Sequence, residues 1–63
     1  MKTTLNQLVN MARKHEPSLN VYCDRTHGQV SIKGMVVFDT RGFAAESVVT
    51  GYLSGFIRAK LYS

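Results

Sequence analysis

Cys23, His15 and His27 are the only side chains in this sequence with a thiol or imidazole that could bind a transition metal or drive nucleophilic catalysis. A structural zinc site needs four ligands, commonly supplied in close pairs, so three are too few. A catalytic thiol needs an accessible, electropositive environment. The pattern around Cys23 instead indicates a strand position that faces the core. We therefore expect a buried, inert Cys23, no metal and no cofactor.

The acidic side chains give no sign of an active site either. Glu16, Asp24, Asp39 and Glu46 show no spacing that would pair two carboxylates for general acid and base catalysis. A chain of 63 residues also has little room for a substrate pocket of about 300–1,000 Å3. We therefore expect that the protein is not an enzyme.

The basic side chains raise a second functional class. The net charge is +4, but the eight lysines and arginines are spread along the whole chain, from Lys2 to Lys60. Nucleic-acid binding needs such charges to cluster on one face. The best place for a cluster is the outer face of a predicted β-hairpin, where bases and an aromatic ring come together. The residues that would contact nucleic acid are Arg13, Lys14, Tyr22, Arg25, His27 and Lys33.

A helix is expected to position the first of these bases, from Leu5 to about His15. Thr4 and Gln7 have the spacing of a capping box, in which each side chain bonds the other residue's backbone N–H. Pro17 disfavours helical geometry at the preceding residue and ends the helix there.

A hairpin is expected next. Residues 19–24 alternate between apolar and polar side chains, as a half-buried strand does, and Gly28 suits the turn that follows. The next strand starts near Gln29. If Asp24 lies opposite Gln29, then Cys23 faces Val30 and the apolar side chains of both strands share one side.

The apolar run that continues to Phe38 can be divided in two ways. Lys33 is a poor first residue for a tight hairpin turn, so one long strand is favoured. The fold is then α+β in the order αββα, an antiparallel hairpin packed on one face by two helices. The alternative is αβββα, with a turn at Lys33-Gly34. Asp39 or Thr40 would cap the last helix.

The last helix, from about Phe43 to Tyr62, carries apolar residues on what reads as two separate stripes. One stripe contains Val49, and the other is formed by Leu53, Ile57 and Leu61. A helix that is apolar on two sides must be buried on both. In so short a chain this predicts a partner, most simply a second copy of the protein.

Gly51 and Gly55 also predict a close neighbour of this helix. Glycine inside a helix costs about 1 kcal/mol relative to alanine, so some element is expected to approach the backbone closely there. That element is either a helix of another subunit or a part of the same chain. The expected interface consists of Val49, Gly51, Leu53, Gly55, Ile57 and Leu61.

The size and composition of the chain indicate the number of domains and the cellular compartment. The 63 residues predict a single small domain, marginally stable alone, and one cysteine allows no internal disulfide. A lone cysteine fits a reducing cytoplasm, and no stretch has the roughly 20 apolar residues of a membrane span. The sequence therefore predicts a small, non-enzymatic cytoplasmic protein, a homo-oligomer that binds a protein partner. The alternative is a weak, basic nucleic-acid-binding module.

Overall fold

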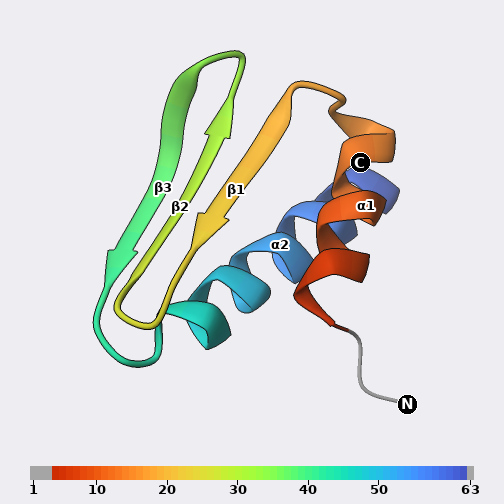
Figure 1. Ribbon diagram of the computed structural model, residues 1–63. Coiled ribbons are helices and arrows are strands. Elements are labelled where there is room, and N and C mark those ends of the chain that lie inside the picture. The colour runs from red at the N-terminus through yellow and green to blue at the C-terminus, as the bar shows by residue number, and fades with distance from the viewer. Residues whose placement is uncertain (1–3, 63) are drawn as a thin grey trace.

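The computed structural model describes residues 4–62, which form two layers (Figure 1). Two helices pack against each other and against one side of a three-stranded antiparallel sheet of order β1-β2-β3. The elements are α1 Leu5–His15, β1 Leu19–Cys23, β2 His27–Ile32, β3 Met35–Arg41 and α2 Ala45–Leu61. The α+β class is confirmed, and the order is the alternative one, αβββα.

Helix α1 has the predicted bounds and the predicted cap. The Thr4 hydroxyl accepts from the Gln7 backbone N–H at 3.2 Å, and the Gln7 side chain accepts from the Thr4 N–H at 2.9 Å. These two bonds satisfy donors that the helix itself leaves unpaired. Leu8 and Ala12 are buried on the face toward α2 and the sheet.

The turn between β1 and β2 is tighter than predicted. The Asp24 carboxylate accepts from the backbone N–H groups of Thr26 and His27, at 2.9 and 2.7 Å. Strand β2 therefore starts at His27, and Cys23 lies opposite Gly28 instead of Val30. The predicted register was wrong by two residues, but an even shift leaves every side chain on its predicted face.

The predicted single long strand is also wrong. A two-residue turn at Lys33-Gly34 joins β2 to β3, with φ of 54° at Lys33 and 79° at Gly34. Two successive positive φ angles are the mark of the tight hairpin turn that suits twisted strands. Val36 now pairs with Ser31 and Phe38 with Val30, so the backbone of this run finds its partners within the chain, and Val37 is the extra residue of a β-bulge.

Because β3 continues to Arg41, neither Asp39 nor Thr40 can cap α2. Ala44 precedes the helix and provides no side-chain cap. The core lies between the layers and consists of Leu8, Ala12, Leu19, Val30, Val49, Leu53 and Ile57. Helix α2 packs tightly on the sheet at Gly28, where a Cβ atom would overlap Val49 and lie 3.2 Å from Thr40 Cγ2.

Candidate protein-binding surface

Half of the predicted interface on α2 is buried inside the chain itself. Val49, Leu53 and Ile57 are in the core, spaced four residues apart on one continuous buried line that starts at Ala45. The division into two apolar stripes was therefore wrong: Val49 and Leu53 lie about 40° apart on the helix, so one stripe holds both. These three residues form no surface, and a charge at Ile57 would disrupt the core.

The other predicted members, Gly51, Gly55 and Leu61, are exposed. Among residues 4–62, no atom lies within 4 Å of the position of a Cβ on either glycine, leaving aside the chain neighbours and the helix's own nearby backbone. The expectation that another part of this chain packs on them is therefore wrong. Leu61, in the last turn, is 62% exposed.

The glycines belong to a smooth surface on the side of α2 opposite its buried line. We call it the α2 solvent face; it is formed by Ser47, Val48, Gly51, Ser54 and Gly55, all exposed. These five residues include no charged side chain and none longer than valine, and the exposed Arg58 follows one turn after Ser54. Such a surface lets another backbone approach closely.

A shallow groove of about 230 Å3 lies between α1 and the C-terminal part of α2. Met11 and Leu61 form exposed apolar walls, and the buried Leu8 and Ile57 lie beneath them. The other residues that line this groove are Ser54, Arg58 and Tyr62. Since Ser54 also belongs to the α2 solvent face, the groove extends that surface toward the C-terminal end of the helix.

The residues predicted to contact nucleic acid are only partly brought together. Tyr22 and His27 do meet on the side of the sheet away from the helices, with ring centres 5.7 Å apart. Each ring, however, is bound to a carboxylate. The Tyr22 hydroxyl donates to Asp24 at 2.8 Å, and His27 Nε2 lies 2.7 Å from Asp39 Oδ1. Asp24 was expected on this face, beside Tyr22. Asp39 was not, because it was expected to cap the last helix and lies instead in β3.

These carboxylates change the electrostatics of the outer face. Hydrogen bonds from the Thr26 backbone and from Tyr22 hold the pKa of Asp24 below its ordinary value, so it stays ionised at neutral pH. The same bond to Asp24, together with its charge, raises the pKa of Tyr22. A negative charge beside the aromatic ring disfavours an approaching phosphate.

The predicted bases do not form one patch. Arg25 and Lys33 lie in the turns at opposite ends of β2, about 25 Å apart at the usual rise of an extended chain. Arg13 instead donates to the Leu19 carbonyl at 2.9 Å and to Asn20 at 3.4 Å. Lys14 is exposed on α1. Lys2 lies outside the described residues.

Cys23 and the histidines are also separated. Cys23 faces the helix layer and His27 the outer side of the sheet, and His15 is at the end of α1. Cys23 is only partly buried, so the prediction of full burial was wrong. Desolvation, and then the charges of Glu46 and Asp24, raise the pKa of the thiol, which disfavours a reactive thiolate. Residues 4–62 contain no group of three or more His, Cys, Asp or Glu that could hold a metal.

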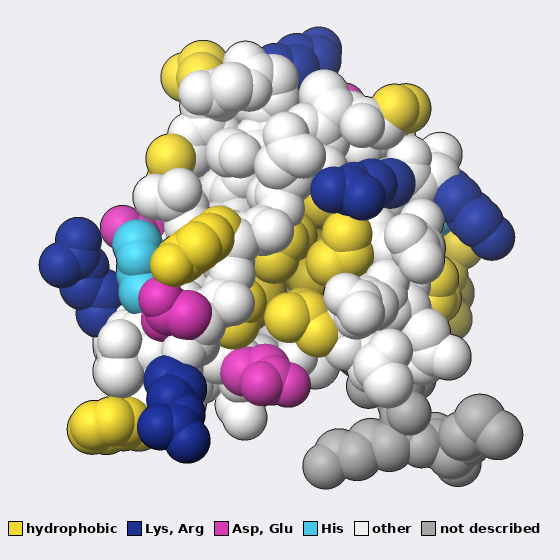
Figure 2. Space-filling view, in the orientation of Figure 1, with side chains coloured by type: hydrophobic (Ala, Val, Ile, Leu, Met, Phe, Trp, Pro, Cys, Tyr) yellow, Lys and Arg dark blue, Asp and Glu magenta, His cyan; other side chains and the backbone are white. Residues whose placement is uncertain are grey.

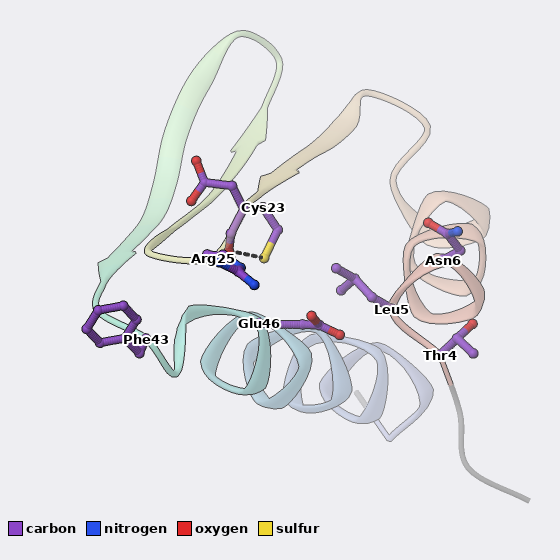
Figure 3. A pocket seen from close by; sticks show the side chains of 8 residues that line it. Thr4, Leu5, Asn6, Cys23, Arg25, Phe43 and Glu46 are labelled. Carbon is purple, nitrogen blue, oxygen red and sulfur yellow. Dashed lines mark hydrogen bonds between the residues drawn. The ribbon is translucent and has the colours of Figure 1, made fainter.

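A second concavity of the structure was not predicted. It is a hollow of about 610 Å3 between β1, α1 and the start of α2, which we call the β1 hollow. Figure 2 shows hydrophobic side chains inside the hollowed middle of this side of the molecule, with acidic and basic side chains around them. Its lining residues are Thr4, Leu5, Asn6, Cys23, Asp24, Arg25, Phe43 and Glu46 (Figure 3).

Comparison with known proteins finds no matching family model, no similar curated protein and no similar solved structure. Within residues 4–62, no helix has the length and apolar character needed to cross a bilayer. The α2 solvent face and the β1 hollow are therefore the surfaces from which a function can be argued.

Proposed function

We propose that this protein is a non-enzymatic interaction protein that acts by binding a protein partner, and that it is a homodimer through the α2 solvent face. The observation that carries this proposal is the open space over Gly51 and Gly55. Each glycine costs the helix about 1 kcal/mol relative to alanine. No contact within the described residues offsets that cost, whereas a closely packed second helix would.

The composition of the surface supports the same conclusion. The centre of a protein interface is poor in charged residues and well packed. From Ser47 to Ile57, α2 contains no charged residue. The exposed Val48 and Leu61 add apolar area. A small chain without a disulfide also gains stability from association, because association buries surface that its own core cannot cover.

Two-fold symmetry suits the position of the glycines. In a symmetric dimer the same patch meets itself, so the residues near the axis contact their own copies. Gly51 and Gly55 lie near the middle of α2 and are one turn apart. With the two α2 helices crossing there, the backbones approach closely and Val48 of each copy packs beside the partner's glycines.

Sedimentation velocity at micromolar concentration tests this proposal. The wild-type chain should sediment as a dimer, and Gly51→Leu should sediment as a folded monomer. The leucine side chain projects into open space, so it leaves the core intact and blocks only the crossing. Asn10→Leu, at an exposed position of α1, is the matched control and should remain dimeric. A wild-type monomer at high micromolar concentration would overturn the proposal.

A further inference from the structure

Strand β1 has backbone groups that point away from the sheet. Asp24 N–H donates to the His27 carbonyl across the turn, which makes this pair hydrogen-bonded. Because bonding alternates along an antiparallel pair, Tyr22 and Asn20 bond to β2 next, and Leu19, Val21 and Cys23 point outward. Leu19 confirms this direction, since its carbonyl accepts from Arg13 and its N–H donates to Glu16.

The outward groups of Val21 and Cys23 differ from those of Leu19. The structure gives them no hydrogen-bond partner among residues 4–62. Together they offer two N–H donors and two carbonyl acceptors along one edge. An edge of this kind is a template for another strand.

The other edge of the sheet is less suited to pairing. Strand β3 contains a bulge at Val37, and its outward positions after the bulge are the charged Asp39 and Arg41. Bulges and charges are the features by which proteins block edge pairing. The β1 edge has neither along Val21–Cys23.

The position of α1 leaves room for a strand beside β1. Helix α2 packs against all three strands, whereas α1 packs against β1 alone. Neighbouring helices are about 8–10 Å apart and neighbouring strands about 4.8 Å. With α2 under the middle strand, α1 therefore lies under the place of a fourth strand beyond β1. The β1 hollow occupies the part of this place that lies next to Cys23 (Figure 3).

The walls of the β1 hollow suit an extended peptide. Leu5 of α1 points across the hollow toward Cys23, and Glu46 of α2 extends below them toward α1 (Figure 3). Leu5 offers apolar contact to a side chain of an added strand that faces the helix layer. Within residues 4–62 the Glu46 carboxylate has no hydrogen bond or ion pair, so it is available to a lysine or arginine.

The same geometry excludes a second copy of the sheet. If β1 paired with β1 of another molecule, both α1 helices would have to lie under the same pair of strands. A helix is about 10 Å across, roughly twice the spacing between strands. Only a segment that brings no helix layer with it can enter.

We propose that the β1 hollow binds an extended peptide segment of a partner protein, with alternating apolar residues and a basic residue, as a fourth strand beside β1. Main-chain bonds to Val21 and Cys23 provide affinity, and the contacts with Leu5 and Glu46 provide specificity. The proposal does not depend on the dimer, because the α2 solvent face lies on the opposite side of α2 from the core.

Peptide selection combined with amide exchange tests this proposal. A phage-displayed library of random 12-residue peptides is selected on the immobilised full chain, and enriched peptides are synthesised. We expect alternating apolar residues with a lysine or arginine among them. In 15N NMR, a bound peptide should slow hydrogen exchange of the Val21 and Cys23 amides at least tenfold and leave the Asp39 and Arg41 amides unchanged.

A matched pair of variants tests the contribution of the Glu46 charge to peptide binding. Glu46→Gln should weaken peptide binding about threefold to tenfold, since it removes one partly exposed charge-assisted contact. Glu16→Gln, an equal change of charge outside the hollow, should weaken it less than twofold. Binding that leaves the Val21 and Cys23 exchange rates unchanged, or that is insensitive to Glu46→Gln, would overturn the proposal. Slow exchange of both amides in the free protein would also overturn it, because the edge would then already be paired.

Discussion

Among single residues, Asp24 shapes the turn that joins β1 to β2. One carboxylate oxygen accepts from two backbone N–H groups of the β1–β2 turn, and the other accepts from the Tyr22 hydroxyl at 2.8 Å. The turn can therefore close in two residues, Arg25 and Thr26, before β2 begins. All of these bonds favour the ionised carboxylate, which is why the pKa of Asp24 is lowered.

Asp24 should make the fold sensitive to acid. Its folded pKa lies below the unfolded value of about 3.9. The stability it contributes is therefore fully present above that value and is lost as the pH falls through the lower, folded pKa. We predict that the melting temperature of the wild-type chain falls more steeply between pH 5 and pH 2 than that of Asp24→Asn. Thermal unfolding followed by circular dichroism measures this difference.

Variants at Tyr22 and Glu16 provide controls for the acid dependence assigned to Asp24. Tyr22→Phe removes one donor but keeps the carboxylate, so it should reduce the acid dependence less than Asp24→Asn does. The pKa of Glu16 is also lowered, by a hydrogen bond from Ser18, and Glu16→Gln should remove a separate part of the dependence. Parallel pH profiles for Asp24→Asn and wild type would contradict the role given to Asp24.

At the scale of elements, the β2–β3 turn conflicts most with local preference. Lys33 is the only residue other than glycine with a positive φ among the described residues. For a residue with a Cβ, that conformation costs roughly 1–2 kcal/mol. The strands determine the turn here. Ile32 must lie beside Met35 for β3 to pair with β2 and cover the core with Phe38.

Replacing this lysine should therefore stabilise the protein. Asparagine is among the best first residues of this turn and tolerates positive φ. We predict that Lys33→Asn raises the free energy of unfolding by roughly 1 kcal/mol in urea titrations. Lys14→Asn loses the same charge in a helix, where asparagine is less favoured, and should not stabilise. A lower stability of Lys33→Asn would mean that the lysine side chain makes a contact of its own.

The elements show where local pattern predicts structure and where it does not. The bounds of α1 followed from its capping box and Pro17, both of which act within a few residues. Register depends on how an exposed side chain such as Asp24 folds back on the turn, and this is not visible in periodicity. The turn at Lys33-Gly34 was missed for the same reason: pairing across strands outweighs the preference of one residue.

The interface residues on α2 separate in the same way. The sequence of the helix alone does not show how wide a contact α1 and the sheet make with it, so Leu53 and Ile57 read as a second stripe. One buried line holds both, since α1 and the sheet meet α2 from adjacent directions. The close approach of another helix to Gly51 and Gly55 stays a prediction. The β1 hollow arises from the relative positions of two layers, which no local pattern reveals.

At the scale of the whole molecule, the helix layer extends beyond the edge of the sheet at β1. This offset produces two distinct surfaces. Helix α2 lies under the middle of the sheet and exposes the α2 solvent face. Helix α1 extends past β1 and leaves an unpaired strand edge above it. A dimer through α2 would leave this edge open in each copy, so the proposed assembly could hold two peptide segments at once. Simultaneous engagement would raise the apparent affinity for a partner with two such segments.

The distribution of charge over the whole molecule weighs against the alternative function in nucleic-acid binding. Arg25 and Lys33 are separated by the length of β2, and Arg13 is bound to the β1 edge. Asp24 and Asp39 lie beside the paired rings of Tyr22 and His27 on the outer face. We predict little binding to short DNA or RNA duplexes at physiological salt, measured by fluorescence anisotropy with labelled duplexes.

Salt dependence makes that prediction quantitative. Each phosphate contact contributes about −0.9 to the slope of log K against log salt on duplex DNA. Dispersed bases should engage about two or three phosphates at once, so any binding seen at low salt should have a shallow slope of about −2 to −3. It should also be equal for all sequences, because the outer face offers no helix that could read base edges in a groove. Tight, sequence-selective binding with a steeper slope would instead favour the nucleic-acid function, and Arg25→Ala and Lys33→Ala would then show which end of β2 contacts the duplex.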